Sequence, residues 1–151
     1  MKLTDILAPE CIRVPLNATT KDEVITELVD LLAESGRISD RDSTLKAVME
    51  REATRSTGIG HALAVPHCKT AACRKLAAAI GKPSTPLDFD SKDGQPVTFI
   101  VLLVSPLNQT GPHIQALARI SRLMLTDRFR ADLGKAETGE EVLRIIAQYE
   151  S

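Results

Sequence analysis

The stretch Val97–Val104 (VTFIVLLV) constrains the fold more than any other part of the chain, because it is almost uninterrupted apolar sequence. A strand with one face in water alternates polar and apolar residues, whereas a run of this kind is typical of a central strand covered on both faces. The pair Asp93–Gly94 just before it is a turn signal. Other elements of the chain must therefore cover this strand from two sides.

The rest of the sequence interleaves helices with short strands. Thr20–Glu23 is a capping box, and apolar residues follow it at helical spacing until Gly36 ends the run. Strands are also expected over 62–65 and 76–80, which predicts a layered α/β fold around one sheet, with its strands parallel, antiparallel or mixed. Further helices are expected from about Asp40 to Ala53, after a cap at Thr110 or Gly111 with Pro112 in the first turn, and from Thr138.

Length and composition indicate one domain spanning residues 1–151, with 43% apolar and 26% charged residues. The net charge of −1 gives no overall attraction to nucleic acid, and no run of about 18 apolar residues is present to insert into a membrane. The start of the chain lacks the pattern of a signal peptide. Cys11, Cys68 and Cys73 form no Cys-x-x-Cys pair and are typical of reduced thiols. We therefore expect a cytoplasmic protein.

His67 is the candidate for chemistry in the run Thr57–Lys69 (TGIGHALAVPHCK). Pro66 restricts Val65 to extended conformations, so we expect a straight strand with His67 at its end, where sites in open α/β sheets lie. No neighbouring residues complete a hydrolytic triad. Such an imidazole suits proton transfer or nucleophilic attack, and attack on phosphorus is favoured. A structural histidine, at the surface or in the core, is the alternative interpretation.

Other residues could hold a phosphoryl group beside His67. His113 belongs to the first turn of its helix, where unpaired N–H groups and the helix dipole favour an anion and disfavour a protonated imidazole. A neutral His113 could donate an N–H to a phosphoryl oxygen, or it could be an exposed helix residue. Arg51 can bind two phosphate oxygens, although most arginines in charged runs are solvated. Ser56 and Thr57 could donate hydroxyl hydrogen bonds or serve as turn residues.

A metal site would have to use the histidines or Cys68. In one regular strand the Cα atoms of His61 and His67 would lie about 20 Å apart. His67 and Cys68 are adjacent and point to opposite faces of an extended chain. A metal site is therefore not expected.

Taken together, Arg51–Glu52, Ser56–Gly60, Ala64–His67 and Lys69 resemble the signature of IIA domains of the bacterial phosphoenolpyruvate-dependent phosphotransferase system. The class is fructose/mannitol, and the similarity is greatest to its nitrogen-regulatory branch. The resemblance implies a single domain with a mixed sheet flanked by helices on both faces. It also implies a phosphotransferase without a cofactor, in which His67 accepts a phosphoryl group from a phosphohistidine on the carrier protein HPr or its nitrogen-branch paralogue. His113 then matches the second active-site histidine of the family, and Arg51 its arginine.

Two main functions follow from this resemblance. A lone IIA unit favours a regulatory phosphoryl acceptor, whose phosphorylation state changes which target proteins it binds. The alternative is a transport component that passes the phosphate to a IIB domain for fructose or a hexitol; a third candidate only binds partners. Two residues depart from the family pattern: Cys68 stands where glycine is common, and His61 where nitrogen-branch relatives often carry asparagine.

Overall fold

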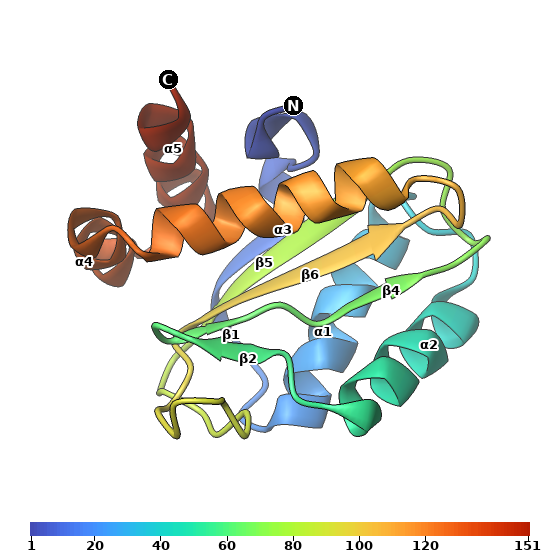
Figure 1. The fold of residues 1–151 in the computed structure, drawn as a ribbon, viewed down its shortest axis with the longest axis horizontal. Helices are drawn as coiled ribbons and strands as arrows, with labels where there is room; N and C mark the ends of the chain where they lie inside the picture. Colours follow the sequence, from blue (N-terminus) through green and yellow to red (C-terminus); the bar gives the residue numbers. More distant parts are fainter.

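The computed structural model describes all residues of the chain, 1–151, and is built around one six-stranded mixed sheet (Figure 1). Its strands are β1 (Ile12–Leu16), β2 (Gly58–Gly60), β3 (Leu63–Ala64), β4 (His67–Lys69), β5 (Ala77–Pro83) and β6 (Phe99–Ser105). The order is β1-β5-β6-β3-β2, with β4 pairing β6 as well. β1 is parallel to β5, and β3 and β4 are parallel to β6, whereas the β5–β6 and β2–β3 pairs are antiparallel. The expectation of a mixed sheet is thus confirmed.

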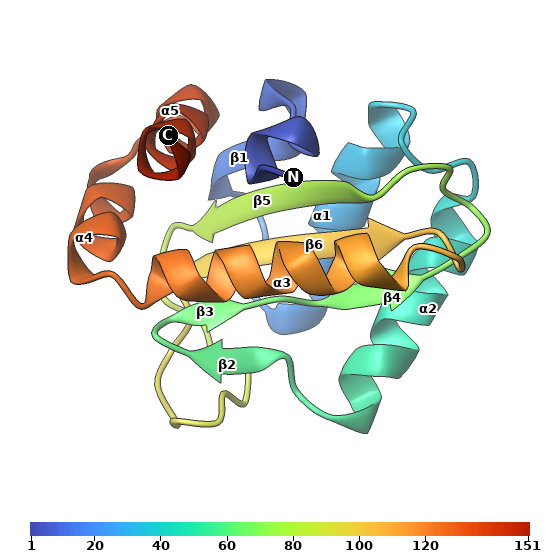
Figure 2. The ribbon, with the colours of Figure 1, turned by 45° about the horizontal axis from the view of Figure 1, so that its top comes forward.

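Helices cover both faces of this sheet. The helices are α1 (Lys21–Glu34), α2 (Arg41–Thr54), α3 (Thr110–Met124), α4 (Asp127–Lys135) and α5 (Gly139–Glu150), with short 3-10 turns at Leu3–Asp5 and Pro9–Cys11. α1 and α2 lie on one face, and α3 runs across the other, with α4 and α5 on the same side as α3 (Figures 1 and 2). The Glu150 carboxylate accepts the backbone N–H of Leu3 at 2.7 Å, which ties the end of α5 to the start of the chain.

The buried strand β6 confirms the prediction made from the apolar run. All seven of its residues are buried. Ile100, Leu102 and Val104 point into the core under α1 and α2, and the alternate residues point into the core under α3, α4 and α5. β6 begins at Phe99, two residues later than the apolar run. Val97, the first residue of that run, pairs instead with Leu87 in an isolated bridge.

The predicted starts of α1, α2 and α5 are confirmed, and the predicted cap of α3 is corrected. The side chains of Thr20, Asp40 and Thr138 accept backbone N–H groups at the starts of α1, α2 and α5. The expected cap of α3 was wrong: its N-cap is Gln109, and Thr110 is already helical. The Thr110 hydroxyl instead accepts a hydrogen bond from Lys69 Nζ at 2.8 Å, so it is engaged by the sheet rather than by its own helix.

The predicted strand before His67 is confirmed, since β3 ends at Ala64, but His67 itself begins the next strand, β4. Ala64 pairs with Ile100, and His67 pairs with Leu103. The pairing register with β6 is therefore the same in β3 and β4, and the two strands continue each other along β6. Pro66 interrupts the line because it has no N–H, but its carbonyl still accepts the Leu103 N–H at 3.0 Å. His67 therefore opens a second strand segment instead of following the last one.

The sequence also left β1, β2 and α4 unpredicted. β1 includes a proline at an edge of the sheet, β2 has only three residues, and α4 follows α3 without a glycine or proline between them. β2 and β3 form a hairpin whose two turn residues, His61 and Ala62, have φ of 54° and 64°. A two-residue turn of this type needs positive φ at both positions, which asparagine tolerates well. This requirement gives a physical reason why asparagine would be tolerated at position 61.

We expect Leu102→Ala to lower the free energy of unfolding by about 2–5 kcal/mol, because it leaves a cavity in the middle of β6. Denaturant unfolding followed by circular dichroism measures this change. Leu107→Ala is the matched control, since this leucine is 64% exposed, and it should shift the stability by less than about 0.5 kcal/mol. Equal losses in the two variants would contradict the central place of β6.

Candidate functional site

His67 has one ring nitrogen fixed and the other available. Its Nδ1 lies 2.8 Å from the carbonyl oxygen of Val65. A carbonyl oxygen can only accept, so Nδ1 carries the proton and donates, and Nε2 keeps its lone pair. Burial lowers the pKa of His67, and the nearby positive charge of Arg51 lowers it further, although the Val65 hydrogen bond opposes this shift. His67 is therefore a neutral imidazole with a nucleophilic nitrogen at pH 7.

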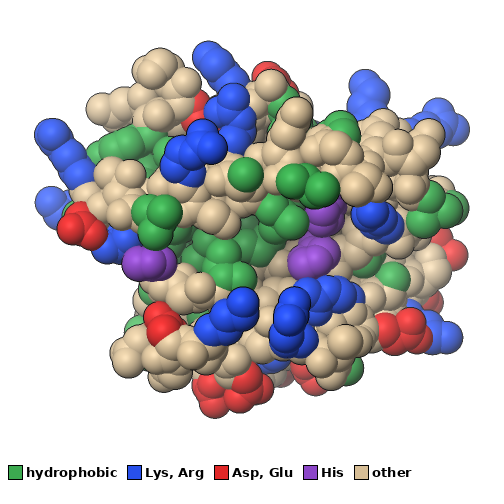
Figure 3. All heavy atoms as spheres, in the orientation of Figure 1, with side chains coloured by type: hydrophobic (Ala, Val, Ile, Leu, Met, Phe, Trp, Pro, Cys, Tyr) green, Lys and Arg blue, Asp and Glu red, His purple; other side chains and the backbone are tan.

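His113 lies directly beside His67. The two ring centroids are 5.1 Å apart and the ring planes meet at 61° (Figure 3, the adjacent purple side chains). His113 is only 5% exposed, so it is not a solvated helix residue. Its Nδ1 is hydrogen-bonded to the hydroxyl of Ser105, the last residue of β6. Burial lowers the pKa of His113 to about 4, with further contributions from His67 and Lys69, so this ring is neutral as well.

Arg51 approaches the two histidines from the last turn of α2. β4 pairs only with β6, so its other edge carries no strand. Helix α2 contacts β4 directly. Nη1 of Arg51 donates to the backbone carbonyl of Arg55 at 2.9 Å, and no carboxylate lies within ion-pair distance of Arg51. Lys69, two residues beyond His67, also lacks a carboxylate partner. Basic side chains lie beside the histidine pair on this face (Figure 3).

Ser56 and Thr57 are occupied by the loop that they belong to. The Ser56 hydroxyl donates to the carbonyl of Phe89 and accepts the N–H of Gly58. Both the N–H and the hydroxyl of Thr57 donate to the buried carboxylate of Glu52, which also pairs with Lys21 Nζ at 2.9 Å. These contacts join the end of α2 to β2, so the two hydroxyls stabilise the loop rather than point to the histidines.

His61 and Cys68 lie away from the histidine pair. His61 is at the exposed turn between β2 and β3, beyond the start of β6. Cys68 points into the core under α1 and α2, on the opposite face of β4 from the ring of His113. Burial, and secondarily Cys73, raises the pKa of Cys68 to about 12, which makes it an unreactive thiol.

Ser105 is the residue at this site that the sequence analysis missed. It is completely buried, yet it closes an apolar strand with a polar side chain. The sequence signal for Ser105 was a polar residue at the end of an apolar strand, eight positions before a histidine in the next helix. Pattern alone does not show that the β6–α3 turn brings these two side chains into contact.

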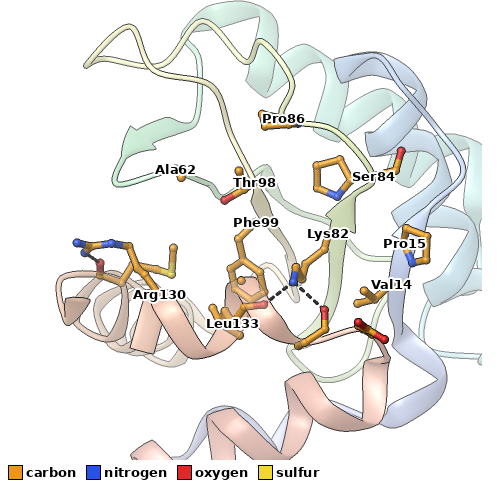
Figure 4. A pocket seen from close by; sticks show the side chains of 15 residues that line it. Val14, Pro15, Ala62, Lys82, Ser84, Pro86, Thr98, Phe99, Arg130 and Leu133 are labelled. Atoms are coloured by element: carbon orange, nitrogen blue, oxygen red, sulfur yellow. Dashed lines mark hydrogen bonds between the residues drawn. The ribbon is translucent and has the colours of Figure 1, made fainter. Parts of the chain in front are cut away.

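No group of three His, Cys, Asp or Glu side chains is arranged to hold a metal ion. None of the five helices combines the length and the apolar character that a bilayer span requires. A pocket of about 690 Å³ lies at the other end of β6, against α4 (Figure 4). Lys82 in this pocket donates to the carbonyls of Leu133 and Ala136 at the end of α4. That lysine therefore caps a helix C-terminus, and none of the predicted site residues lines the pocket.

The sequence and the fold of this chain agree with a known family. Residues 5–149 match the family model described as the phosphoenolpyruvate-dependent sugar phosphotransferase system, EIIA 2. The chain belongs to this EIIA 2 family. The match covers nearly the whole sequence, including every residue of the histidine site.

Relatives of this EIIA 2 chain carry different names. The fructose-specific EIIABC component of Bacillus subtilis is 33% identical over 150 residues, which are 99% of this chain but only 24% of that protein. The nitrogen regulatory protein of Bradyrhizobium diazoefficiens is 31% identical over 147 residues, 97% of this chain and 95% of the relative. The crystal structure of nitrogen regulatory protein IIA-Ntr from Neisseria meningitidis superposes with a TM-score of 0.88 at 28% identity, covering 95% of this chain and 98% of that one.

The low pKa of His113 predicts a loss of stability in mild acid. In the unfolded chain this pKa is near 6.5 and in the folded chain about 4, so the unfolded state binds more protons between these values. The free energy of unfolding should therefore fall as pH drops through this window, by up to about 1.4 kcal/mol per pH unit for one histidine. Chemical denaturation at pH 7, 6 and 5 measures the slope.

His113→Gln should make this slope shallower, leaving the part that comes from His67. Leu107→Ala, which removes an exposed side chain that does not titrate, is the control and should keep the slope of the parent chain. The same slope in His113→Gln as in the parent would contradict the assignment to His113.

Proposed function

We propose that this chain is a regulatory IIA protein that accepts a phosphoryl group on Nε2 of His67 from a phosphohistidine carrier, HPr or its nitrogen-branch paralogue. The observation that carries the proposal is the fixed tautomer of His67, which leaves a nucleophilic nitrogen beside a second neutral imidazole and an unpaired guanidinium. The whole of residues 1–151 acts as one IIA unit, and its place of action is the cytoplasm.

The transfer itself needs position and charge rather than further chemistry. The lone pair of His67 Nε2 attacks phosphorus while the bond from phosphorus to the donor nitrogen breaks, and the donor ring leaves with that electron pair. The His67 ring gains positive charge, which the Val65 carbonyl stabilises through the retained Nδ1–H. No metal ion or cofactor enters this step.

Arg51 and His113 stabilise the phosphoryl oxygens. The guanidinium of Arg51 has no carboxylate to neutralise it and can bind two oxygens at once. His113 is held against the His67 ring and can donate one N–H to a third oxygen. Preorganised donors of this kind cost no rearrangement at the moment of transfer.

Regulation is supported by the likeness to the Neisseria meningitidis nitrogen regulatory protein. A phosphoryl group adds negative charge to a surface that now carries unpaired cations, and this change can alter which target proteins bind. The second candidate is sugar transport, in which the phosphate passes to a fructose-type IIB domain. It is supported by the similarity to the fructose-specific component of Bacillus subtilis.

Incubation with phosphoenolpyruvate, enzyme I and each carrier should place one acid-labile phosphate on the parent chain and none on His67→Ala. Intact mass before and after acid treatment measures this, and His61→Asn is the control that should keep the label. Phosphate on His67→Ala, or on neither protein, would overturn the proposal. Onward transfer to a purified fructose-type IIB domain would favour transport over regulation.

Arg51→Ala should slow single-turnover phosphoryl transfer by about 10²-fold, because one preorganised charge on the phosphoryl oxygens is lost. The matched control is Arg55→Ala, which removes a neighbouring cation but keeps the backbone carbonyl that Arg51 binds. Rapid-quench kinetics gives both rates. An unchanged melting temperature together with a slow rate supports the catalytic role, whereas equal rates in the two variants would remove Arg51 from the site.

A further inference from the structure

The hydroxyl of Ser105 has one hydrogen-bond partner. Ser105 is completely buried at the end of β6, and its backbone carbonyl accepts the N–H of Thr70 at 2.9 Å. Its side-chain oxygen bonds only to Nδ1 of His113. No other group of the protein is hydrogen-bonded to this hydroxyl, so within the chain His113 decides whether its hydrogen is satisfied.

This geometry fixes the proton on His113. A hydroxyl can donate one hydrogen, and a buried donor without an acceptor is strongly disfavoured. If Nδ1 of His113 carried a proton, the Ser105 oxygen could accept it, but the hydroxyl hydrogen would then have no partner. The satisfied arrangement has Ser105 donating to an unprotonated Nδ1, with the proton of the neutral ring on Nε2.

We propose that Ser105 is a positioning residue that holds His113 as the neutral Nε2–H tautomer, so that this N–H can bind the phosphoryl group on His67. Its part in transfer rests on the function proposed above. The two rings then carry opposite tautomers: the Val65 carbonyl leaves a lone pair on Nε2 of His67, and the Ser105 hydroxyl leaves a proton on Nε2 of His113. One ring supplies the nucleophile and the other the donor.

Ser105 also keeps His113 uncharged. An imidazolium carries a proton on both nitrogens, so protonation of His113 would leave the Ser105 hydroxyl without its acceptor. The groups that face His113 act in the same direction, since burial, His67 and Lys69 all disfavour a positive charge on this ring. A neutral donor hydrogen-bonds the incoming phosphoryl group without repelling the cations around it.

The first test is the tautomer of His113 in the unmodified protein, measured by long-range ¹H–¹⁵N correlation at pH 7. We expect an unprotonated Nδ1 and a protonated Nε2 on His113, and the opposite pattern on His67. A protonated Nδ1 on His113 would overturn the proposal. This measurement needs no phosphoryl donor, so it stands or fails separately from the proposed function.

The second test compares Ser105→Ala with Ser105→Thr. Ser105→Ala should admit the Nδ1–H tautomer of His113 and slow single-turnover transfer about tenfold, which corresponds to one lost hydrogen bond. Ser105→Thr keeps the hydroxyl and should restore both the tautomer and the rate. Ser105→Ala with the parent's tautomer and rate would overturn the proposal.

A double-mutant cycle separates positioning from a general loss of structure. In a His113→Ala background the Ser105 hydroxyl has no ring to orient, so Ser105→Ala should change the transfer rate less than twofold. A further tenfold loss in that background would show that Ser105 acts through the strand and not through His113. This result decides the proposal even if the threonine variant does not fold.

Discussion

The parallel pairing of β3 and β4 with β6 is the constraint on which the rest of the site depends. The pairing register with β6 is the same on both sides of Pro66, so His67 lies opposite Leu103, close to the end of β6. The same strand ends at Ser105, and a short turn later α3 delivers His113. Two segments that are distant in sequence are thereby fixed against one rigid strand, and their rings meet at 5.1 Å.

The site combines permanent positive charge with neutral rings. Arg51 and Lys69 have no carboxylate partner, and the nearest acidic residue in the motif, Glu52, is occupied by Lys21 and Thr57. The imidazoles stay uncharged because His113 is buried and His67 partly buried, which lowers the pKa of both rings. Such an arrangement favours a dianionic phosphoryl group more than water does, since the cations are already in place and need no reorganisation. Under the function proposed above, a phosphoryl group on His67 would offset part of this positive charge.

Some residues of the shared motif form the histidine site, and others stabilise the segments that carry it. Ser56, Thr57 and Glu52 join α2 to β2 through buried hydrogen bonds, and this junction fixes the helix end that carries Arg51. Sequence similarity does not distinguish the two roles, because both kinds of residue occur in the same short run. Cys68 belongs to neither group, since its side chain packs in the core on the far face of β4.

The sequence by itself determined the layered α/β class, the central strand and the caps of α1 and α5, because each depends on local periodicity or on one side chain and a nearby N–H group. It also indicated His67, Arg51 and His113 as candidates. Only the tertiary structure decided the strand directions and the split of the strand at Pro66. The hydrogen bond between Lys69 and Thr110 and the contact of Ser105 with His113 were also visible only in the tertiary structure. Both contacts depend on how the chain packs, and such contacts leave no periodic pattern in the sequence.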